Sequence, residues 1–481
     1  MKRRILVFLL ALCLAAALVP VTAFAGAMFG GGTGTKDDPW LITSRDNLIA
    51  LAEFLNSGNA ATNYNNCDGY YFKQTADIDL TGVKWEPIGY SGDTCFAGNY
   101  DGDGHIIANA KSTGKRYPGE EEGDYFATAG IFGWVLFGSV QNLHVKAADF
   151  VATGENNYSF VGGITGVCYG ASIQNCLVTD SKLESRQENN NNCAGSIAGY
   201  SAGGTFENCA AENNQVKSMA YGGGFVGEVD DDNDGITTPS AFINCYAADC
   251  TVTGVTPNKS GSSFIGGFAG QITNEKPTAE NCFVYRVKLS TDGTFASNTS
   301  IGVFAGNLWG NPSAHYQSKI ITKNCFYGEC GTTEKAEGAE QKTAKEFENG
   351  TVAKQLGGKF VQHGGSPSLS IEPADYSAVD AAIAKANKLN RDEYKDFSAV
   401  EAAINAVDRS KKTLKEQAAV DAMAKAIEDA IAALEKKPVK MAVQLPQTGD
   451  DSNLALWTAL LLVSGAAICT MMAGKRKNYE K

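Results

Sequence analysis

Residues 223–227 read Gly-Gly-Phe-Val-Gly and residues 244–245 read Asn-Cys, and these two marks recur together along the middle of the chain. The glycine-rich cassette has six copies, at 129–133, 162–166, 195–199, 223–227, 266–270 and 302–306. The second mark follows each copy, as Asn-Leu at 142–143 and as Asn-Cys at 175–176, 208–209, 244–245, 281–282 and 324–325. The Asn residues lie 33, 33, 36, 37 and 43 residues apart, so each copy is one structural unit with loops of variable length.

The apolar runs beside these marks predict strands. They are short, interrupted by glycine and alternating, as in Cys-Phe-Val-Tyr at 282–285, which argues against helices. A strand unit repeated six times without a helical pattern between copies predicts a mainly β solenoid whose coils share one apolar interior. Each coil then places its Asn and Cys at an equivalent point. This predicts a column of Asn amides and a column of small, buried thiols.

Two motifs resemble those of known solenoid proteins. The cassettes resemble the GLUG motif, a Gly-Leu-any-Gly repeat of bacterial surface proteins, with Ile or Phe in place of Leu in most copies. Residues 99–107, Asn-Tyr-Asp-Gly-Asp-Gly-His-Ile-Ile, are similar to a segment near the start of many right-handed parallel β-helices. The resemblance covers about residues 31–358 and implies a right-handed parallel β-helix, which we assign to 26–362, with an adhesive or sugar-related role.

The ends of such a solenoid need covering, because open strand edges pair with other chains. Ser44 is a favourable N-cap, and Leu48, Leu51, Phe54 and Leu55 follow it at helical spacing. A second short helix is expected at 343–356. Both are interpreted as end caps.

A helical module is expected after a linker at 363–372. The composition changes there to Ala, Lys and acidic residues, and apolar residues recur at helical intervals within 373–437. Short connections favour three antiparallel helices. The pattern resembles the FIVAR module of wall-anchored proteins, most specifically at 419–434. Two roles are open for this module. It could bind a ligand, or it could act as a spacer that holds the β-helix away from its anchor.

The first 25 residues predict a secretory signal peptide. Lys2, Arg3 and Arg4 precede an apolar run, and a small-residue site ends at Ala25, so cleavage is expected between Ala25 and Gly26.

The last 37 residues combine three elements. They are a pentapeptide, a mainly apolar segment at 454–474 that is long enough to span a bilayer, and a basic tail at 475–481. A short linker that starts at 438 joins the helical module to the pentapeptide, and linker and pentapeptide together span 438–449. The pentapeptide is Leu445, Pro446, Gln447, Thr448 and Gly449.

This order resembles the cell-wall sorting signal of Gram-positive surface proteins. The resemblance implies that a sortase cuts between Thr448 and Gly449 and joins the Thr448 carbonyl to peptidoglycan. The protein would then be displayed on the extracellular surface, and only its precursor would be inserted in the membrane. A membrane protein held by segment 454–474 is the alternative.

Composition excludes some functions. The net charge of −12, from 41 Lys and Arg against 53 Asp and Glu, argues against nucleic acid as a partner. Four His in 481 residues make a His-built catalytic or metal centre improbable. A glycan or host-protein ligand is expected instead.

One acidic loop could bind calcium. Asp230, Asp232 and Asp234 have the spacing of the opening of a Ca²⁺ loop, with Gly235 at its sixth position. Ala241 stands where the bidentate Glu belongs. A weak Ca²⁺ site and a solvated acidic loop are therefore both open, and no other cofactor is expected.

Eleven cysteines remain between the expected signal peptide and the apolar segment. We interpret them mainly as small buried hydrophobes, since Cys fills apolar interiors well. A Cys245–Cys250 or Cys325–Cys330 bridge is the oxidised alternative.

Catalytic signals are weak. Asp101, Asp103 and His105 form the one compact acidic and His cluster in a strand-turn context, but Asp-Gly-Asp-Gly also suits a tight turn, which we favour. No nucleophile motif or phosphate loop occurs. The sequence therefore predicts a protein that is not an enzyme and acts as an adhesin or glycan-binding protein, with sugar contacts from loop residues such as those at 156–158 and 189–192. A β-helix polysaccharide lyase or glycosidase and a passive spacer are the alternatives.

Overall fold

A computed structural model describes residues 28–58, 65–118, 125–153, 156–186, 192–230, 238–255, 263–273, 276–292, 299–309, 318–409 and 413–438. The expected signal peptide, the sorting pentapeptide and segment 454–474 lie outside these ranges, so they stay predictions. Among the residues in these ranges, no helix is long and apolar enough to cross a membrane.

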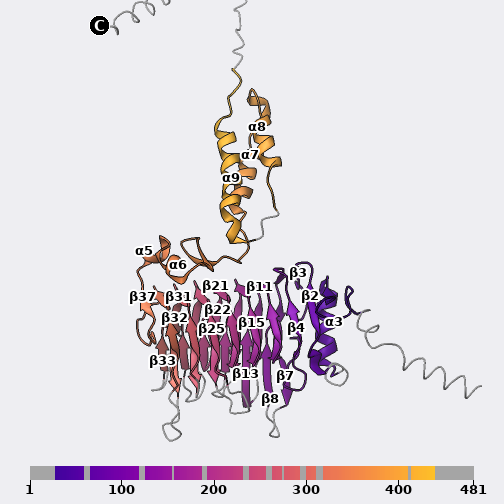
Figure 1. Cartoon of the computed structure of the whole chain (residues 1–481), viewed down its shortest axis with the longest axis vertical. Coiled ribbons are helices and arrows are strands. Elements are labelled where there is room, and N and C mark those ends of the chain that lie inside the picture. The colour runs from indigo at the N-terminus through magenta and orange to yellow at the C-terminus, as the bar shows by residue number, and fades with distance from the viewer. Residues whose placement is uncertain are drawn as a thin grey trace, which may run out of the picture. The chain divides into compact units, whose positions relative to one another are not determined.

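The repeats fold into a solenoid of parallel strands (Figure 1). Each complete coil adds one strand to each of five sheets, in the order A, B, C, E, D, whereas within the described ranges the incomplete coils at the two ends add strands to sheets A and B alone. Sheet E also holds one extra, antiparallel strand. Sheet A consists of β1 (Trp40–Ile42), β2 (Tyr71–Gln74), β4 (Asn99–Asp101), β10 (Ser139–Gln141), β15 (Ser172–Gln174), β20 (Thr205–Glu207), β25 (Ala241–Ile243), β30 (Thr278–Glu280) and β35 (Ile321–Lys323). Sheet B consists of β3 (Ile78–Asp79), β5 (Ile106–Ala108), β11 (His144–Lys146), β16 (Leu177–Thr179), β21 (Ala210–Glu212), β26 (Tyr246–Ala248), β31 (Phe283–Tyr285), β36 (Phe326–Gly328) and β37 (Glu340–Gln341).

The other three sheets complete each coil. Sheet C consists of β6 (Lys111–Ser112), β12 (Asp149–Thr153), β17 (Lys182–Arg186), β22 (Gln215–Ser218), β27 (Thr251–Gly254) and β32 (Lys288–Thr291). Sheet E consists of β7 (Lys115–Pro118), β8 (Tyr125–Ala129), β13 (Asn156–Gly162), β18 (Asn192–Gly195), β23 (Tyr221–Gly223), β28 (Ser263–Gly266) and β33 (Thr299–Gly302). Sheet D consists of β9 (Phe132–Leu136), β14 (Thr165–Tyr169), β19 (Ala198–Ala202), β24 (Val226–Asp230), β29 (Ala269–Thr273) and β34 (Ala305–Trp309). The prediction of a mainly β fold of stacked parallel strands is confirmed, and its handedness stays a prediction.

The glycine cassettes form the sharp turn from sheet E to sheet D. A Cβ on Gly223 would lie 1.8 Å from the carbonyl oxygen of Val226. A Cβ on Gly227 would lie 2.5 Å from the carbonyl oxygen of Gly199. Since real Cβ atoms do not approach backbone this closely, only glycine fits where the strands turn back on each other.

The Asn marks form the predicted column. All six Asn residues take a left-handed backbone conformation, with φ of 52° or 53°, at the corner between sheets A and B. In five of them Nδ2 donates to the Oδ1 of the Asn one coil earlier, over 2.7 to 3.0 Å, and the first, Asn142, donates to Asp101 Oδ1 over 2.9 Å. Asn suits this column because it tolerates the left-handed region and carries both a donor and an acceptor.

The Cys residues of the five Asn-Cys marks occupy equivalent points of successive coils and form the second predicted column. All eleven cysteines between Cys67 and Cys330 are buried and unbridged. Cys245 Sγ donates to the carbonyl oxygen of Ile243 over 3.3 Å, and Cys250 Sγ to that of Ala248 over 3.2 Å. Neither alternative bridge, Cys245–Cys250 or Cys325–Cys330, is formed in the structure, and the predicted burial of the thiols is confirmed.

The N-terminal cap matches its prediction. Helix α3 (Arg45–Asn56) begins after Ser44, whose hydroxyl accepts a hydrogen bond from the Asn47 N–H. Its apolar side chains Leu48, Leu51, Phe54 and Leu55 are buried in the same core as the first coils. The helix thus extends the interior of the solenoid past its first strands.

The second expected cap differs from its prediction. Residues 343–356 form two short helices, α5 (Ala344–Glu348) and α6 (Thr351–Leu356), and Thr343 and Glu346 close a capping box on α5. With the antiparallel hairpin β38 (Phe360–His363) and β39 (Ser366–Leu369), they bury the outer face of sheet B. The shared cluster holds Leu177, Ala210, Tyr246, Ala248, Phe283, Tyr285 and Phe326 of sheet B, and Phe347, Val352, Leu356, Phe360 and Leu369 of the covering elements.

The expected linker at 363–372 is instead folded. All four residues of β39 are buried, and Leu369 packs in the cluster on sheet B. Gly364 and Gly365, with φ of 56° and 85°, form the hairpin turn. Glycines are common in linkers, which is why this segment was expected to be one, but a two-residue hairpin turn also requires glycine.

Three helices follow within the expected range 373–437: α7 (Ser377–Asn387), α8 (Ser398–Asn405) and α9 (Gln417–Ala432). The predicted apolar positions Val379, Val400, Val420 and Ile427 are fully buried. Short 3-10 turns occur at Asn65–Cys67, Arg391–Glu393 and Leu414–Glu416. The chain divides into two compact units, Met1–Asp380 with Val407–Lys425, and Ala381–Ala406 with Ala426–Lys481. The solenoid lies wholly in the first unit.

Candidate binding surface on sheet C

The outer face of sheet C carries two rows of polar side chains. Strand alternation turns Phe150, Leu183, Val216 and Val252 into the core, where they are fully buried. The residues between them face outward and align from strand to strand because the pairing is in register. The first row is Lys111, Asp149, Lys182, Gln215, Thr251 and Lys288, and the second is Val151, Glu184, Lys217, Thr253 and Ser290.

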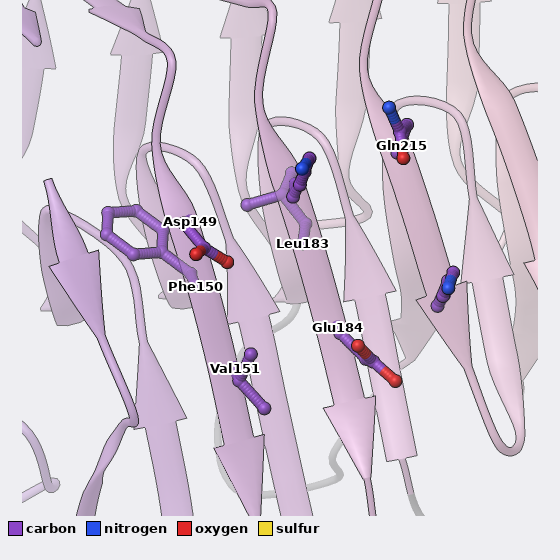
Figure 2. A pocket seen from close by; sticks show the side chains of 8 residues that line it. Asp149, Phe150, Val151, Leu183, Glu184 and Gln215 are labelled. Carbon is purple, nitrogen blue, oxygen red and sulfur yellow. The ribbon is translucent and has the colours of Figure 1, made fainter. Parts of the chain in front are cut away.

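A shallow hollow of about 170 Å³ lies on this face, lined by Asp149, Phe150, Val151, Lys182, Leu183, Glu184, Gln215 and Lys217. Figure 2 shows Asp149 and Val151 on one strand, Glu184 on the next and Gln215 on the third. The hollow therefore presents carboxylate, ammonium and amide groups within three adjacent strands, which suits hydrogen bonding to a hydroxyl-rich or charged ligand.

Two ion pairs organise the charges of sheet C. Lys111 Nζ lies 3.0 Å from Asp149 Oδ2. Arg186 holds Glu184 through two hydrogen bonds of 2.6 and 2.8 Å. Lys182, Lys217 and Lys288 are exposed and make no ion pair within the described ranges. These three ammonium groups are therefore available to a ligand.

The Asp101, Asp103 and His105 cluster is the tight turn that we favoured. Asp101 Oδ1 accepts a hydrogen bond of 2.8 Å from the Asp103 N–H, and Asp103 and Gly104 take φ of 50° and 79°. Asp103 pairs with Lys73 at 3.2 Å, and His105 Nδ1 lies 3.1 Å from Asp77 Oδ1. Each polar group therefore has a partner within the turn or on the neighbouring coil.

The calcium candidate lies mostly outside the described ranges. Asp230 ends β24 and is half-buried, whereas Asp232 and Asp234 are not described. Where the structure is described, no three His, Cys, Asp or Glu side chains are grouped so that they could hold a metal ion. The Ca²⁺ site stays a prediction.

Two of the expected sugar contacts are occupied within the protein. The Tyr158 ring stacks on Phe126 at 5.2 Å and on Phe160 at 5.7 Å, so its faces are covered. Asn192 is buried and accepts a hydrogen bond of 2.6 Å from Ser159 Oγ. These side chains therefore support the fold.

A buried polar cluster between sheets D and E was not predicted. Glu228 Oε1 accepts hydrogen bonds from Gln271 Nε2 at 3.0 Å and Thr273 Oγ1 at 3.1 Å, and Cys193 Sγ donates to Oε2 at 3.2 Å. Burial raises the pKa of the Cys193 thiol, which keeps it protonated and unreactive. Glu228 and Gln271 follow the cassette glycine in successive copies and are in register, which was the available signal. Strand alternation by itself predicts one buried face, whereas β18, β24 and β29 are buried on both faces.

A second buried cluster joins sheet B to the covering hairpin. The Tyr246 hydroxyl oxygen lies 2.5 Å from Glu212 Oε1 and 2.6 Å from Glu372 Oε1. Since the hydroxyl has one hydrogen, one of the two contacts needs a protonated carboxyl. Burial, followed by the charge of Glu212, raises the pKa of Glu372 well above its ordinary value. The Glu372 carboxyl is therefore neutral where an exposed glutamate would be ionised.

Comparisons with known proteins give partial matches. No protein-family profile matches the chain, so the GLUG, FIVAR and sorting-signal resemblances stay predictions. A stretch of 113 residues is 30% identical to a candidate Gly-rich membrane protein of Evansella cellulosilytica. That stretch covers 22% of this chain and spans only 11% of the relative.

Two solved structures align with much of this chain. The crystal structure of a candidate immunoglobulin A1 protease from Bacteroides ovatus has a TM-score of 0.47 and 20% identity, covering 72% of this chain and 96% of that one. A structure named IgA1 Protease has a TM-score of 0.33 and 13% identity, covering 76% of this chain and 28% of that one. At these values the likeness carries no specific activity over to this chain.

The prediction that the chain is not an enzyme is withdrawn: both solved structures are named as proteases, although their likeness assigns no activity to this chain. The prediction rested on missing motifs, and catalytic groups need not form sequence motifs. Enzymatic activity is therefore retained among the functions to be tested.

Proposed function

We propose that this chain is a bacterial surface protein whose solenoid binds extracellular glycan on the outer face of sheet C. The observation that carries the proposal is the polar hollow over β12, β17 and β22, which the described covering elements leave open. Its donors and acceptors repeat at the strand spacing, as a polymer with repeated hydroxyl groups requires.

The anchoring part of the proposal comes from the chain ends. A signal peptide ending at Ala25 and a sortase site at Thr448 would attach residues 26–448 covalently to peptidoglycan. The helices α7 to α9 would serve as a spacer between the solenoid and this anchor. Deleting 445–449 tests the anchor: wall linkage is expected to be lost, and linkage that survives would contradict the sortase assignment.

Retention of purified residues 26–448 on a glycan array tests the binding function. Saturable retention that leaves the glycans intact supports a binding protein, with a host-protein ligand to be tested if no glycan is retained. The array eluate is also assayed for new sugar ends, because cleavage would identify an enzyme.

A polysaccharide-cleaving enzyme is the second candidate function. Asp149 and Glu184 line the same hollow as Lys182, and carboxylates beside a basic group are what acid and base catalysis on a sugar polymer needs. Released sugar ends that disappear in both Asp149→Asn and Glu184→Gln would establish it. Incubation of the same preparation with immunoglobulin A1 tests proteolysis. New fragments of immunoglobulin A1 would identify a protease and contradict both glycan binding and polysaccharide cleavage as the function.

A further inference from the structure

We propose that the outer face of sheet C selects anionic polysaccharides, meaning those that carry carboxylate or sulfate groups. The inference rests on the proposed glycan-binding function and names its ligand class. It follows from the charges on this face, from three lysines that have no ion-pair partner among the described residues, and from the spacing of these lysines.

The outer face of sheet C is basic although the chain is acidic. It carries five basic side chains, Lys111, Lys182, Arg186, Lys217 and Lys288, against two acidic ones, Asp149 and Glu184. The whole chain has a net charge of −12. A local excess of positive charge on an acidic protein attracts an anion to that face and leaves the rest of the surface repulsive.

Three of these basic groups are uncommitted. Lys111 and Arg186 are held by Asp149 and Glu184. Lys182, Lys217 and Lys288 are exposed and have no carboxylate partner among the residues described. By contrast, Lys323 on the outer face of sheet A is paired with Glu280 at 2.6 Å. An incoming carboxylate or sulfate therefore meets free ammonium groups on sheet C, without first having to displace a protein partner.

The uncommitted lysines form a strip, as a polymer requires. Lys182 and Lys288 occupy the same row three strand steps apart, about 14 Å at ordinary strand spacing. Lys217 lies one strand from Lys182 and two residues further along, in the second row. Gln215, Thr251 and Thr253 lie between them and can hydrogen-bond sugar hydroxyls.

The same face is poorly suited to nucleic acid. Single-stranded nucleic acid is usually held by base stacking on aromatic side chains, and no aromatic side chain occupies an outward position of sheet C in the described ranges. The negative charge of the rest of the chain also opposes the dense charge of a phosphate backbone. Polysaccharide is therefore the ligand class that these side chains favour.

The test compares polygalacturonate, chondroitin sulfate, uncharged dextran and single-stranded DNA as titrants of the full chain. Both anionic glycans are expected to bind, more weakly at 500 mM than at 50 mM salt because the contacts are exposed and screened. The double variant Lys182→Gln with Lys217→Gln is expected to bind at least about tenfold more weakly, which corresponds to about 1.4 kcal/mol. Lys323→Gln is the matched control, and its affinity should be unchanged.

Each other outcome overturns a stated part of the account. Dextran binding that is insensitive to salt and to the double variant would overturn the anionic selectivity and leave glycan binding intact. Binding of DNA alone, or of none of the titrants, would overturn both. Melting curves of each variant confirm that the fold is retained, and the single variant Lys217→Gln gives a second measurement if the double variant is destabilised.

Discussion

Sheets B and C are built from the same coils, yet the outer face of sheet B is buried and the outer face of sheet C is exposed. The outer face of sheet B presents Tyr246, Phe283 and Phe326, which are buried under α5, α6 and the β38–β39 hairpin. The outer face of sheet C presents Lys182, Glu184 and Lys217 around an open hollow. Because the coil fixes only the inward positions, the outward positions are free to bury a covering element or to meet a ligand.

The largest expected effect comes from the covered face. Phe283 stacks on Tyr246 at 4.4 Å and lies 5.8 and 5.9 Å from the rings of Phe347 and Phe360. Phe283→Ala should therefore lower the free energy of unfolding by about 3–5 kcal/mol, measured by urea denaturation. Val151→Ala on sheet C is the control and should cost less than about 1 kcal/mol. Equal losses would mean that the two faces do not differ as described.

The Asn column, which lies at the corner between sheets A and B, should give the next largest effect. Asn244→Ala removes both ladder contacts, to Asn208 and Asn281, and places alanine at φ near 53°. A loss of about 2–4 kcal/mol is expected from the unpaired amide groups and the left-handed backbone. Asn244→Gly relieves only the backbone part, so it should be less destabilising than Asn244→Ala. A loss below about 0.5 kcal/mol for both variants would refute the ladder as a source of stability.

The Glu372 carboxyl gives a pH dependence specific to the covered face. Its pKa is raised in the folded state, so its stabilising effect is complete below the ordinary pKa of glutamate and is lost as pH rises through the raised value. The wild-type melting temperature should therefore fall from pH 5 to pH 8 more steeply than that of Glu372→Gln, whose amide cannot ionise. Glu212, Asp249, Asp180 and His363 also act on this cluster and remain in both proteins. Parallel pH profiles would show that Glu372 holds no proton.

The smallest stability effect should come from the open face. Lys217 is exposed and has no ion-pair partner where the structure is described. Lys217→Gln should change the free energy of unfolding by less than about 0.5 kcal/mol, measured by urea denaturation, while weakening glycan retention. A large loss of stability would show instead that Lys217 serves the fold.

The repeat made the interior predictable, because the period places equivalent residues on equivalent points of each coil. The stacked strands, the Asn column and the buried thiols follow from that period alone. The outward positions do not, since the same alternation in Lys-Leu-Glu-Ser-Arg at 182–186 and in Phe-Val-Tyr at 283–285 leads to exposure in one case and burial in the other.

Whether an outer face is buried or exposed depends on residues far away in the chain. Phe347, Phe360 and Leu369 cover sheet B, and residues 363–372 were expected to be a linker because their glycines and proline suit one. The candidate site on sheet C was missed for a related reason. Lys182, Lys217 and Lys288 lie on three different strands, so their alignment becomes visible only when the register between strands is known.

Lysine acetylation of the full chain, with and without polygalacturonate, tests the central claim most directly. Mass spectrometry follows Lys182, Lys217 and Lys288 on sheet C, with Lys73 and Lys323 on sheet A and Lys146 on sheet B as internal references. The account predicts that bound glycan slows acetylation of the three sheet C lysines and leaves the references unchanged. Protection of the references alone, or equal protection of all six, would contradict sheet C as the binding surface.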